Sequence, residues 1–295
     1  MTNAAQFGEQ AKRLSREGDY AAAEAELRAG LVQHPRHQML EYALGILLLA
    51  RGEHREGWDY YENRRAFPGL AAPPPGFPEW GGEVVESLLV LPEQGLGDQI
   101  MFARYVPQLV ARGMRVTLAT PPPLAVLFRH LGAEVVAVDG ATPIARHDAW
   151  CLIGSLPRHL GTLPTEAYLP GGAGGSGVGM MLTGGPRAAD RSLPDDMAAR
   201  LADLGRSLHP QDTGARDFSE TAEIIRGLSL VVSVDTSVAH LAGAMGKQVW
   251  VLLPEPSDWR WGRGASSPWY PTARLFRQAR SGDWGAVVEA VRSQL

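Results

Sequence analysis

Hydrophobic and polar positions follow a helical pattern over residues 1–68 of the chain. Apolar side chains return there every three to four positions, which is the spacing of one face of an α-helix. The turn Gly18-Asp19-Tyr20 returns as Gly52-Glu53-His54, a period of 34 residues. Each unit is therefore predicted to form a helix, a turn and a second helix, with small residues where the two helices approach.

Only about two such units fit into residues 1–68. Helical repeats bury their apolar faces against neighbouring repeats, so a pair needs a further surface to pack on. We expect the helices to pack on the following domain or on a second chain, which leaves oligomerisation open. Two interpretations of their role stay open as well: a cap on the main domain, or a surface that binds a partner protein.

The pattern changes after a proline-rich linker at residues 69–80. Short apolar runs, typical of buried strands, then alternate with helical stretches, which predicts an α/β fold with mainly parallel sheets. The alternation restarts after a glycine-rich segment at residues 171–179, interpreted as a hinge between lobes at residues 81–170 and 180–295. Strands are predicted at 87–91, 114–119, 134–138, 150–153, 178–182, 229–234 and 249–253, and helices at 99–112, 123–131, 195–204, 219–228, 237–245 and 283–295.

Composition narrows the function classes. The formal net charge of −4 gives no basic field for nucleic acid or an anionic membrane. No run of 18 apolar residues exists to insert into a bilayer, and the first residues have no signal-peptide core. Cys151 is the single cysteine, and the histidines are scattered, so neither a disulfide nor a metal site is predicted. We expect a cytoplasmic protein without a metal.

The segment at residues 231–246 carries the strongest chemical signal. An apolar strand turns through Asp235, Thr236 and Ser237 directly into a helix. The free amides and positive end of such a helix bind a diphosphate well, and the two hydroxyls add donors. His240, one turn into the helix, is expected to reach a phosphate or a ribose. The alternative is that one of the three turn residues only caps the helix.

A second turn, Gln94-Gly95-Leu96-Gly97-Asp98, follows the first predicted strand. Its two glycines allow a ligand to approach the backbone, and Asp98 falls at a helix N-terminus facing the predicted cleft. A plain helix cap is again the alternative. The aromatic run at residues 258–261 and the pair at 269–270 are predicted either to stack on a base or sugar, with Arg260 on a phosphate, or to pack the closing helix onto the sheet.

Several short motifs recur in an order that resembles bacterial GT-B glycosyltransferases. The helical units resemble tetratricopeptide repeats, and the whole is similar to repeat-fused members related to ADP-heptose transferases and to the O-GlcNAc transferase. Besides residues 231–246, the resemblance rests on Trp80-Gly81-Gly82, Glu93-Gln94-Gly95-Leu96-Gly97-Asp98, Phe102-Ala103-Arg104-Tyr105-Val106-Pro107, Ser155-Leu156-Pro157, Asp258-Trp259-Arg260-Trp261-Gly262, Ser267-Pro268-Trp269-Tyr270-Pro271-Thr272 and Leu275-Phe276-Arg277-Gln278.

The resemblance implies a sugar transferase with an acceptor-side first lobe and a second lobe that binds a nucleotide sugar as co-substrate. It implies inversion at the sugar without a metal or another cofactor, and a protein acceptor, such as flagellin, presented by the repeats. Asp98 would be the general base, although a helix N-terminus weakens a carboxylate in that role. The implied residues are Gln94, Gly95 and Gly97 for the acceptor, and Asp235, Thr236, Ser237, His240, Arg191 and Arg260 for the donor.

The chain departs from this family around the Gly-Gly-Pro turn at residues 184–186, where the usual aromatic residue and histidine are absent. Only about 36 residues separate the flanking strand and helix, fewer than a full helix–strand passage needs. Two alternatives therefore stay open. One is an inactive transferase-like domain that serves as a repeat scaffold, and the other is a transferase for a small acceptor such as a lipopolysaccharide sugar.

Overall fold

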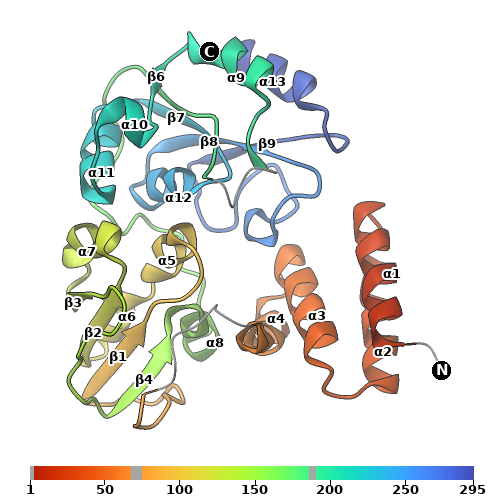
Figure 1. The fold of residues 1–295 in the computed structure, drawn as a ribbon, viewed down its shortest axis with the longest axis vertical. Coiled ribbons are helices and arrows are strands. Elements are labelled where there is room, and N and C mark those ends of the chain that lie inside the picture. The colour runs from red at the N-terminus through yellow and green to blue at the C-terminus, as the bar shows by residue number, and fades with distance from the viewer. Residues whose placement is uncertain (1–2, 68–74, 186–190) are drawn as a thin grey trace.

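The computed structural model describes residues 3–67, 75–185 and 191–295. A helical segment and two α/β lobes make up this part of the chain (Figure 1). The helical segment lies beside both lobes: its helix His54–Tyr61 contacts the first lobe and its helix Gln38–Arg51 contacts the second. Within the described residues, no helix is long and apolar enough to cross a membrane.

The helical segment forms two antiparallel helix pairs, as the 34-residue period predicts. Gly52 ends the third helix in the left-handed conformation, with φ of 85°, which favours glycine. Gly45 allows a close approach of the fourth helix, because a Cβ there would lie 2.8 Å from the Tyr61 amide nitrogen. Their assignment as tetratricopeptide repeats stays a prediction. The elements are α1 (Ala4–Arg16), α2 (Tyr20–Gln33), α3 (Gln38–Arg51), α4 (His54–Tyr61) and the 3-10 helix η1 (Glu62–Ala66).

The N-terminal lobe has a parallel four-stranded sheet in the order β3-β2-β1-β4. Its central strand, β1, is buried along its whole length, which explains its unbroken apolar sequence. The elements are β1 (Ser87–Leu91), α5 (Leu96–Ala103), α6 (Val106–Ala111), β2 (Arg115–Thr120), α7 (Pro122–Phe128), η2 (Arg129–Leu131), β3 (Glu134–Ala137), β4 (Ala149–Leu152), η3 (Ile153–Ser155) and α8 (Leu156–Leu160).

The helix predicted at residues 99–112 is wrong as a single element. The chain forms α5 and α6 instead, and Arg104 and Tyr105 connect them. Pro107 explains the break, because it has no N–H to donate to Ala103 and its ring clashes with that carbonyl in a continuous helix. As a consequence, α5 is a short helix that points its N-terminus at the other lobe.

The C-terminal lobe has a parallel five-stranded sheet in the order β6-β5-β7-β8-β9. The sequence did not predict β6, α10 or β9. The short segment between β5 and α11 contains the helix α9 and the two-residue strand β6. The elements are β5 (Val178–Met181), α9 (Asp195–Ala202), β6 (Arg206–Ser207), α10 (Pro210–Thr213), α11 (Phe218–Arg226), β7 (Leu230–Val234), α12 (Ser237–Ala244), β8 (Gln248–Leu253), η5 (Trp259–Trp261), β9 (Ala273–Arg277) and α13 (Trp284–Arg292).

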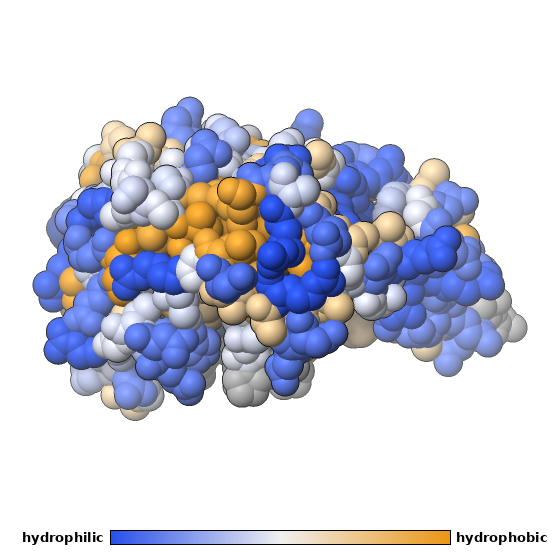
Figure 2. All heavy atoms as spheres, turned by 90° about the horizontal axis from the view of Figure 1, so that it is seen from above, coloured by the Kyte–Doolittle hydropathy of each residue, from blue (hydrophilic) through white to orange (hydrophobic). Residues whose placement is uncertain are grey.

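One apolar core continues from the helical segment into both lobes. Trp58 of α4 meets Phe102 of the N-terminal lobe and Trp269 of the C-terminal lobe, with ring centroids 6.0 Å apart in each pair. The expectation that the helices pack on the following domain is therefore confirmed. Figure 2, seen from above, shows apolar side chains gathered on the C-terminal lobe among hydrophilic ones, while the helical segment at the right is mostly hydrophilic.

The glycine-rich segment at residues 171–179 is attached to the C-terminal lobe. Its backbone donates from Gly172 to Met245 and from Ser176 to Gly227. The ammonium group of Lys247, which is buried, donates to the Gly174 carbonyl at 2.8 Å. The role of the segment as a hinge between the lobes stays a prediction.

Candidate functional site

A polar cleft of about 1000 Å³ lies where strands of both lobes end at their carboxyl sides. The segments that follow β1, β7 and β8 line it. Strand order reverses beside β1 in the first sheet and between β5 and β7 in the second. Ligands of parallel α/β sheets bind at such reversal points, and the volume suits a small organic ligand. The topology therefore directs both lobes at one ligand site.

The start of α12 forms one wall of this cleft. The chain leaves the buried strand β7 through Asp235 and enters the helix after Thr236. The first amides of a helix have no carbonyl partner within it, so the N–H groups of Ser237 and Val238 suit an anion. Thr236 and Ser237 are partly exposed and line the cleft.

Asp235 holds an arginine in place. Its Oδ2 accepts a hydrogen bond from Arg191 Nη1 at 2.9 Å, and its side chain is only 3% exposed. Burial and the negative charge of Asp258 raise the pKa of Asp235, while Arg191 opposes this shift. A buried carboxylate cannot itself attract a phosphate, so the geometry gives Asp235 the task of positioning Arg191 on the cleft wall.

Asp98 lies on the opposite wall, in the first turn of α5. Its Oδ2 accepts from the Gly95 amide at 2.9 Å, so it does cap the helix. Its Oδ1 lies 2.5 Å from Arg260 Nη2, and the carboxylate also lines the cleft. Asp98 is therefore both a cap and a cleft residue. Gly97 beside it brings the lobes together, because a Cβ there would lie 2.9 Å from the His240 ring.

Arg260 connects the two walls. It pairs with Asp98 of the N-terminal lobe and, through Nη1, with Asp258 at 2.8 Å. Its Nη2 also donates to Gln94 Oε1 at 2.9 Å. Burial would raise the pKa of Asp258, but the charge and hydrogen bonds of Arg260 lower it below its ordinary value. The guanidinium is thus held by two carboxylates on the lining of the cleft.

His240 is neutral inside the lobe interface. Its Nδ1 lies 3.0 Å from the Tyr270 hydroxyl, and its ring stacks on Trp261 with centroids 4.8 Å apart. Burial lowers the pKa of His240 to about 3, so the ring carries no charge for a phosphate. The residue lines the cleft, where it can exchange a neutral hydrogen bond with a ligand.

The aromatic run after β8 packs the molecule together. Trp259 meets Tyr61 of α4, with ring centroids 5.2 Å apart, and Trp269 is 1% exposed. Trp261 is buried against His240. Of the two predicted roles, stacking on a base or sugar is thus excluded for these buried rings. They do pack, but against α4 and His240 and not between the closing helix and the sheet.

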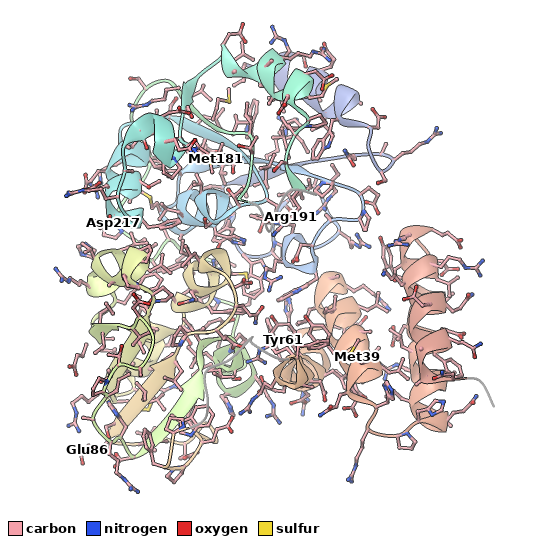
Figure 3. The ribbon with its side chains drawn as sticks, in the orientation of Figure 1. Met39, Tyr61, Glu86, Met181, Arg191 and Asp217 are labelled. Carbon is pink, nitrogen blue, oxygen red and sulfur yellow. The ribbon has the colours of Figure 1, made fainter. Side chains whose placement is uncertain are left out.

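A second cavity, of about 350 Å³, opens at the carboxyl ends of β5 and β6. Met181 and Thr183 line it from β5, and His209 lines it beyond β6. Neighbouring strands lie about 4.8 Å apart, so β6 and β7 are separated by about 10 Å across β5. This separation suits a nucleoside that extends from a diphosphate at α12. Figure 3 labels Met181 inside the lobe and Arg191 on the side turned toward the N-terminal lobe.

Sequence reasoning missed two residues of the site. Asp258 was considered only as part of an aromatic run, and its pairing with Arg260 has no sequence signal. Tyr61 was not singled out within the helical units, yet its hydroxyl lies 3.0 Å from Gln94 Nε2. An aromatic residue with a polar tip in a buried repeat position is the one signal that could have drawn attention to it.

Part of the segment in which the chain departs from the family lies outside the described residues. The Gly-Gly-Pro turn begins at Gly184 and Gly185, but residues 186–190, where the family's histidine is expected, are not described. The same holds for residue 68 of the predicted helical segment and for residues 69–74 of the predicted linker. Within the described ranges, no group of three His, Cys, Asp or Glu side chains is placed to hold a metal ion.

Two parallel α/β lobes around a polar cleft resemble the GT-B architecture of glycosyltransferases. Residues 175–281 match the model of Glycosyltransferase family 9 (heptosyltransferase). This range contains every strand of the second sheet and the start of α12. The chain thus carries a glycosyltransferase domain.

Comparison with particular proteins gives more distant likenesses. The chain is 26% identical over 330 aligned positions to Protein FlbA of Caulobacter vibrioides, covering 86% of this chain and 55% of that protein. The chain therefore spans about half the length of this curated relative. Among solved structures, the iron-containing dodecameric glycosyltransferase TibC from enterotoxigenic E. coli H10407 is 15% identical with a TM-score of 0.47, covering 72% of this chain and 66% of TibC. E. coli heptosyltransferase WaaC with ADP is 12% identical with a TM-score of 0.44, covering 71% and 100%.

Proposed function

We propose that the protein transfers a sugar from a nucleotide-sugar donor to a protein acceptor. One observation carries the proposal: the anion-binding start of α12 and the carboxylate of Asp98 lie on opposite walls of one cleft. A transferase needs a site for a departing diphosphate and a base for the acceptor hydroxyl, with space for a sugar between them. The cleft offers these three features together.

In this proposal the reaction is one inverting displacement without a metal. The acceptor oxygen attacks the anomeric carbon while Asp98 takes its proton, and the bond to the diphosphate oxygen breaks. The electron pair leaves with the diphosphate, which the amides of Ser237 and Val238 stabilise. Arg191 and Arg260 line the same cleft and supply positive charge. The nucleoside extends toward the cavity at β5 and β6.

The helical segment is the reason for proposing a protein acceptor, because its exposed face lies outside the lobes and is open to a partner. Flagellin is the acceptor that the resemblance suggests. The family description, which contains the word heptosyltransferase, favours a small sugar acceptor as a second candidate. Transfer measured in parallel on a flagellin preparation and on a lipopolysaccharide core distinguishes the two acceptors.

An inactive scaffold is the third candidate, and the charges of the cleft favour it. Both cleft arginines are already paired with carboxylates, Arg191 with Asp235 and Arg260 with Asp98 and Asp258. Three carboxylates against two guanidiniums leave this cluster one unit negative, which opposes an anionic donor. A donor must therefore break some of these ion pairs in order to bind to the arginines, whereas in an inactive scaffold the ion pairs stay intact.

Asp98→Asn is the first test. The amide keeps the size of the side chain and an oxygen for the Gly95 cap, but it cannot take a proton. We expect transfer from the active donor among UDP-, GDP- and ADP-sugars to fall about 10²- to 10⁴-fold. Donor binding, followed as a thermal shift, should persist.

The control is Asp59→Asn, which removes a carboxylate from the surface of α4, where it pairs with Arg158. It should transfer sugar at the wild-type rate. Full transfer by Asp98→Asn would disprove the role of this residue. Absence of a thermal shift with every donor would leave the scaffold as the function.

A further inference from the structure

The helical segment reaches into the cleft through one side chain. The Tyr61 hydroxyl, at the end of α4, donates to Gln94 Oε1 at 3.1 Å and accepts from Gln94 Nε2 at 3.0 Å. Arg260 Nη2 approaches the same hydroxyl at 3.4 Å and donates to Gln94 Oε1 at 2.9 Å. Three parts of the chain, far apart in sequence, therefore meet at one phenol oxygen, and two of its partners line the cleft.

Packing holds Tyr61 in a single place. Its side chain is fully buried, and its ring meets Trp58 and Trp259 edge-on, with centroids 5.5 and 5.2 Å away. Figure 3 shows Tyr61 at the junction of the helical segment with the lobes. The hydroxyl is thus a fixed reference point for the two flexible side chains that it contacts.

The segments on both sides of this contact are also locked to each other. Arg64, one turn beyond Tyr61, forms two hydrogen bonds to Glu93, at 2.7 and 2.9 Å. Glu93 directly precedes Gln94, so the backbone that carries the amide is tied to the backbone that carries the phenol. Both charged side chains are at most 1% exposed, which makes this attachment rigid.

Gln94 has an unusual backbone. Its φ is 60°, in the left-handed region that residues other than glycine seldom adopt. Such a conformation persists only where surrounding contacts enforce it, and it is frequent at binding and catalytic sites. Here the turn directs the side chain away from the strand axis toward Tyr61 and Arg260. The strain coincides with the point where the helical segment meets the cleft.

We propose that Tyr61 is a positioning residue of the transfer site, so that the site is complete only with the helical segment in place. Tyr61 orients the Gln94 amide, and the amide oxygen then holds one nitrogen of Arg260. This arrangement adds a third contact to the guanidinium on the cleft wall, beside its ion pairs with Asp98 and Asp258. The inference rests on the proposed function, because Arg260 matters only if a charged ligand enters the cleft.

The test compares Tyr61→Phe with Tyr105→Phe in the full chain. Each change removes one hydroxyl from a buried tyrosine and keeps its ring, and Tyr105 donates only to the Thr162 carbonyl, within its own lobe. We expect similar small losses of thermal stability in both variants. Affinity for the tightest binder among ADP, UDP and GDP should fall roughly tenfold in Tyr61→Phe alone, the effect of one hydrogen bond to a charged group.

A second measurement needs no ligand. The side-chain amide resonances of Gln94 are identified by their loss in Gln94→Leu, and they should shift in Tyr61→Phe but not in Tyr105→Phe. Unchanged resonances, or equal nucleotide affinity in both tyrosine variants, would overturn the positioning role. If the wild-type protein binds none of the three nucleotides, the proposed function fails, whereas the resonances still report whether Tyr61 holds Gln94.

Discussion

Replacing Arg64 by methionine tests whether the helical segment and the lobes form one folding unit. The Arg64 guanidinium is buried, with Glu93 as its main partner and Ser155 and Glu62 as further acceptors. Arg64→Met keeps the apolar stem of the side chain and removes the charge. Glu93 then stays buried, with the Gly154 amide, at 2.8 Å, as a hydrogen-bond donor.

The expected cost follows from that uncompensated carboxylate. Removing one partner of a buried ion pair costs about 3–5 kcal/mol, far more than the pair itself contributes. Arg65→Met is the matched control, because Arg65 pairs with Glu79 where both side chains are more than a third exposed. Such a surface pair contributes less than about 1 kcal/mol. Neighbouring arginines on one 3-10 turn should therefore differ about fivefold in their effect on stability.

Urea unfolding followed by tryptophan fluorescence measures both variants, since Trp58 reports on the contact between the helices and the lobes. The double variant Arg64→Met/Glu93→Gln should be more stable than Arg64→Met alone, because the amide carries no charge. A loss below about 1 kcal/mol in Arg64→Met would contradict the reasoning. The reasoning would also be contradicted if the stability losses of Arg64→Met and Glu93→Gln simply added up in the double variant.

Two further predictions concern the lobe interface. Unfolded chains protonate histidine near pH 6.5, but burial holds the pKa of His240 at about 3, so protons favour the unfolded state between these values. Wild type should therefore lose about 2 kcal/mol more than His240→Gln between pH 6.5 and 5 in urea unfolding, and equal losses would contradict the assignment. Gly97→Ala places a Cβ 2.9 Å from the His240 ring and should cost about 1–3 kcal/mol. Gly8→Ala, whose Cβ meets its nearest atom at 3.8 Å, should cost nothing, and equal thermal midpoints would disprove the close contact.

The sequence predicted those elements whose hydrophobic pattern is determined by burial alone. The strand β7 is apolar except for Ser233 because both of its faces are covered, and α12 begins only three positions after it ends. The strand β9 escaped prediction because Arg274 and Arg277 interrupt its apolar pattern, and the two residues of β6 are too few to form any pattern. Competition between Pro107 and helical periodicity explains why a single helix was predicted over residues 99–112.

Individual residues that line the cleft could be predicted from local motifs, but the contacts between these residues could not. Asp98 and Arg260 were both expected to line the cleft, each from its own local motif. Their contact joins two lobes across most of the chain, and periodicity carries no information at such a separation. For the same reason Tyr61 has no signal in a repeat, where an aromatic residue is explained by packing alone.

The contacts between the helical segment and the lobes also determine which experiment can identify the acceptor. Removal of residues 1–68 would take away Trp58 and Tyr61, and it would expose the buried Glu93 charge together with the apolar core beneath α4. Loss of transfer after such a truncation would follow from damage to the cleft for a protein acceptor and for a small acceptor alike. Substitutions on the exposed face of the helices avoid this ambiguity. Val32 and Met39 are 81% and 55% exposed, and changes at such exposed positions of the helices separate acceptor binding from the integrity of the site.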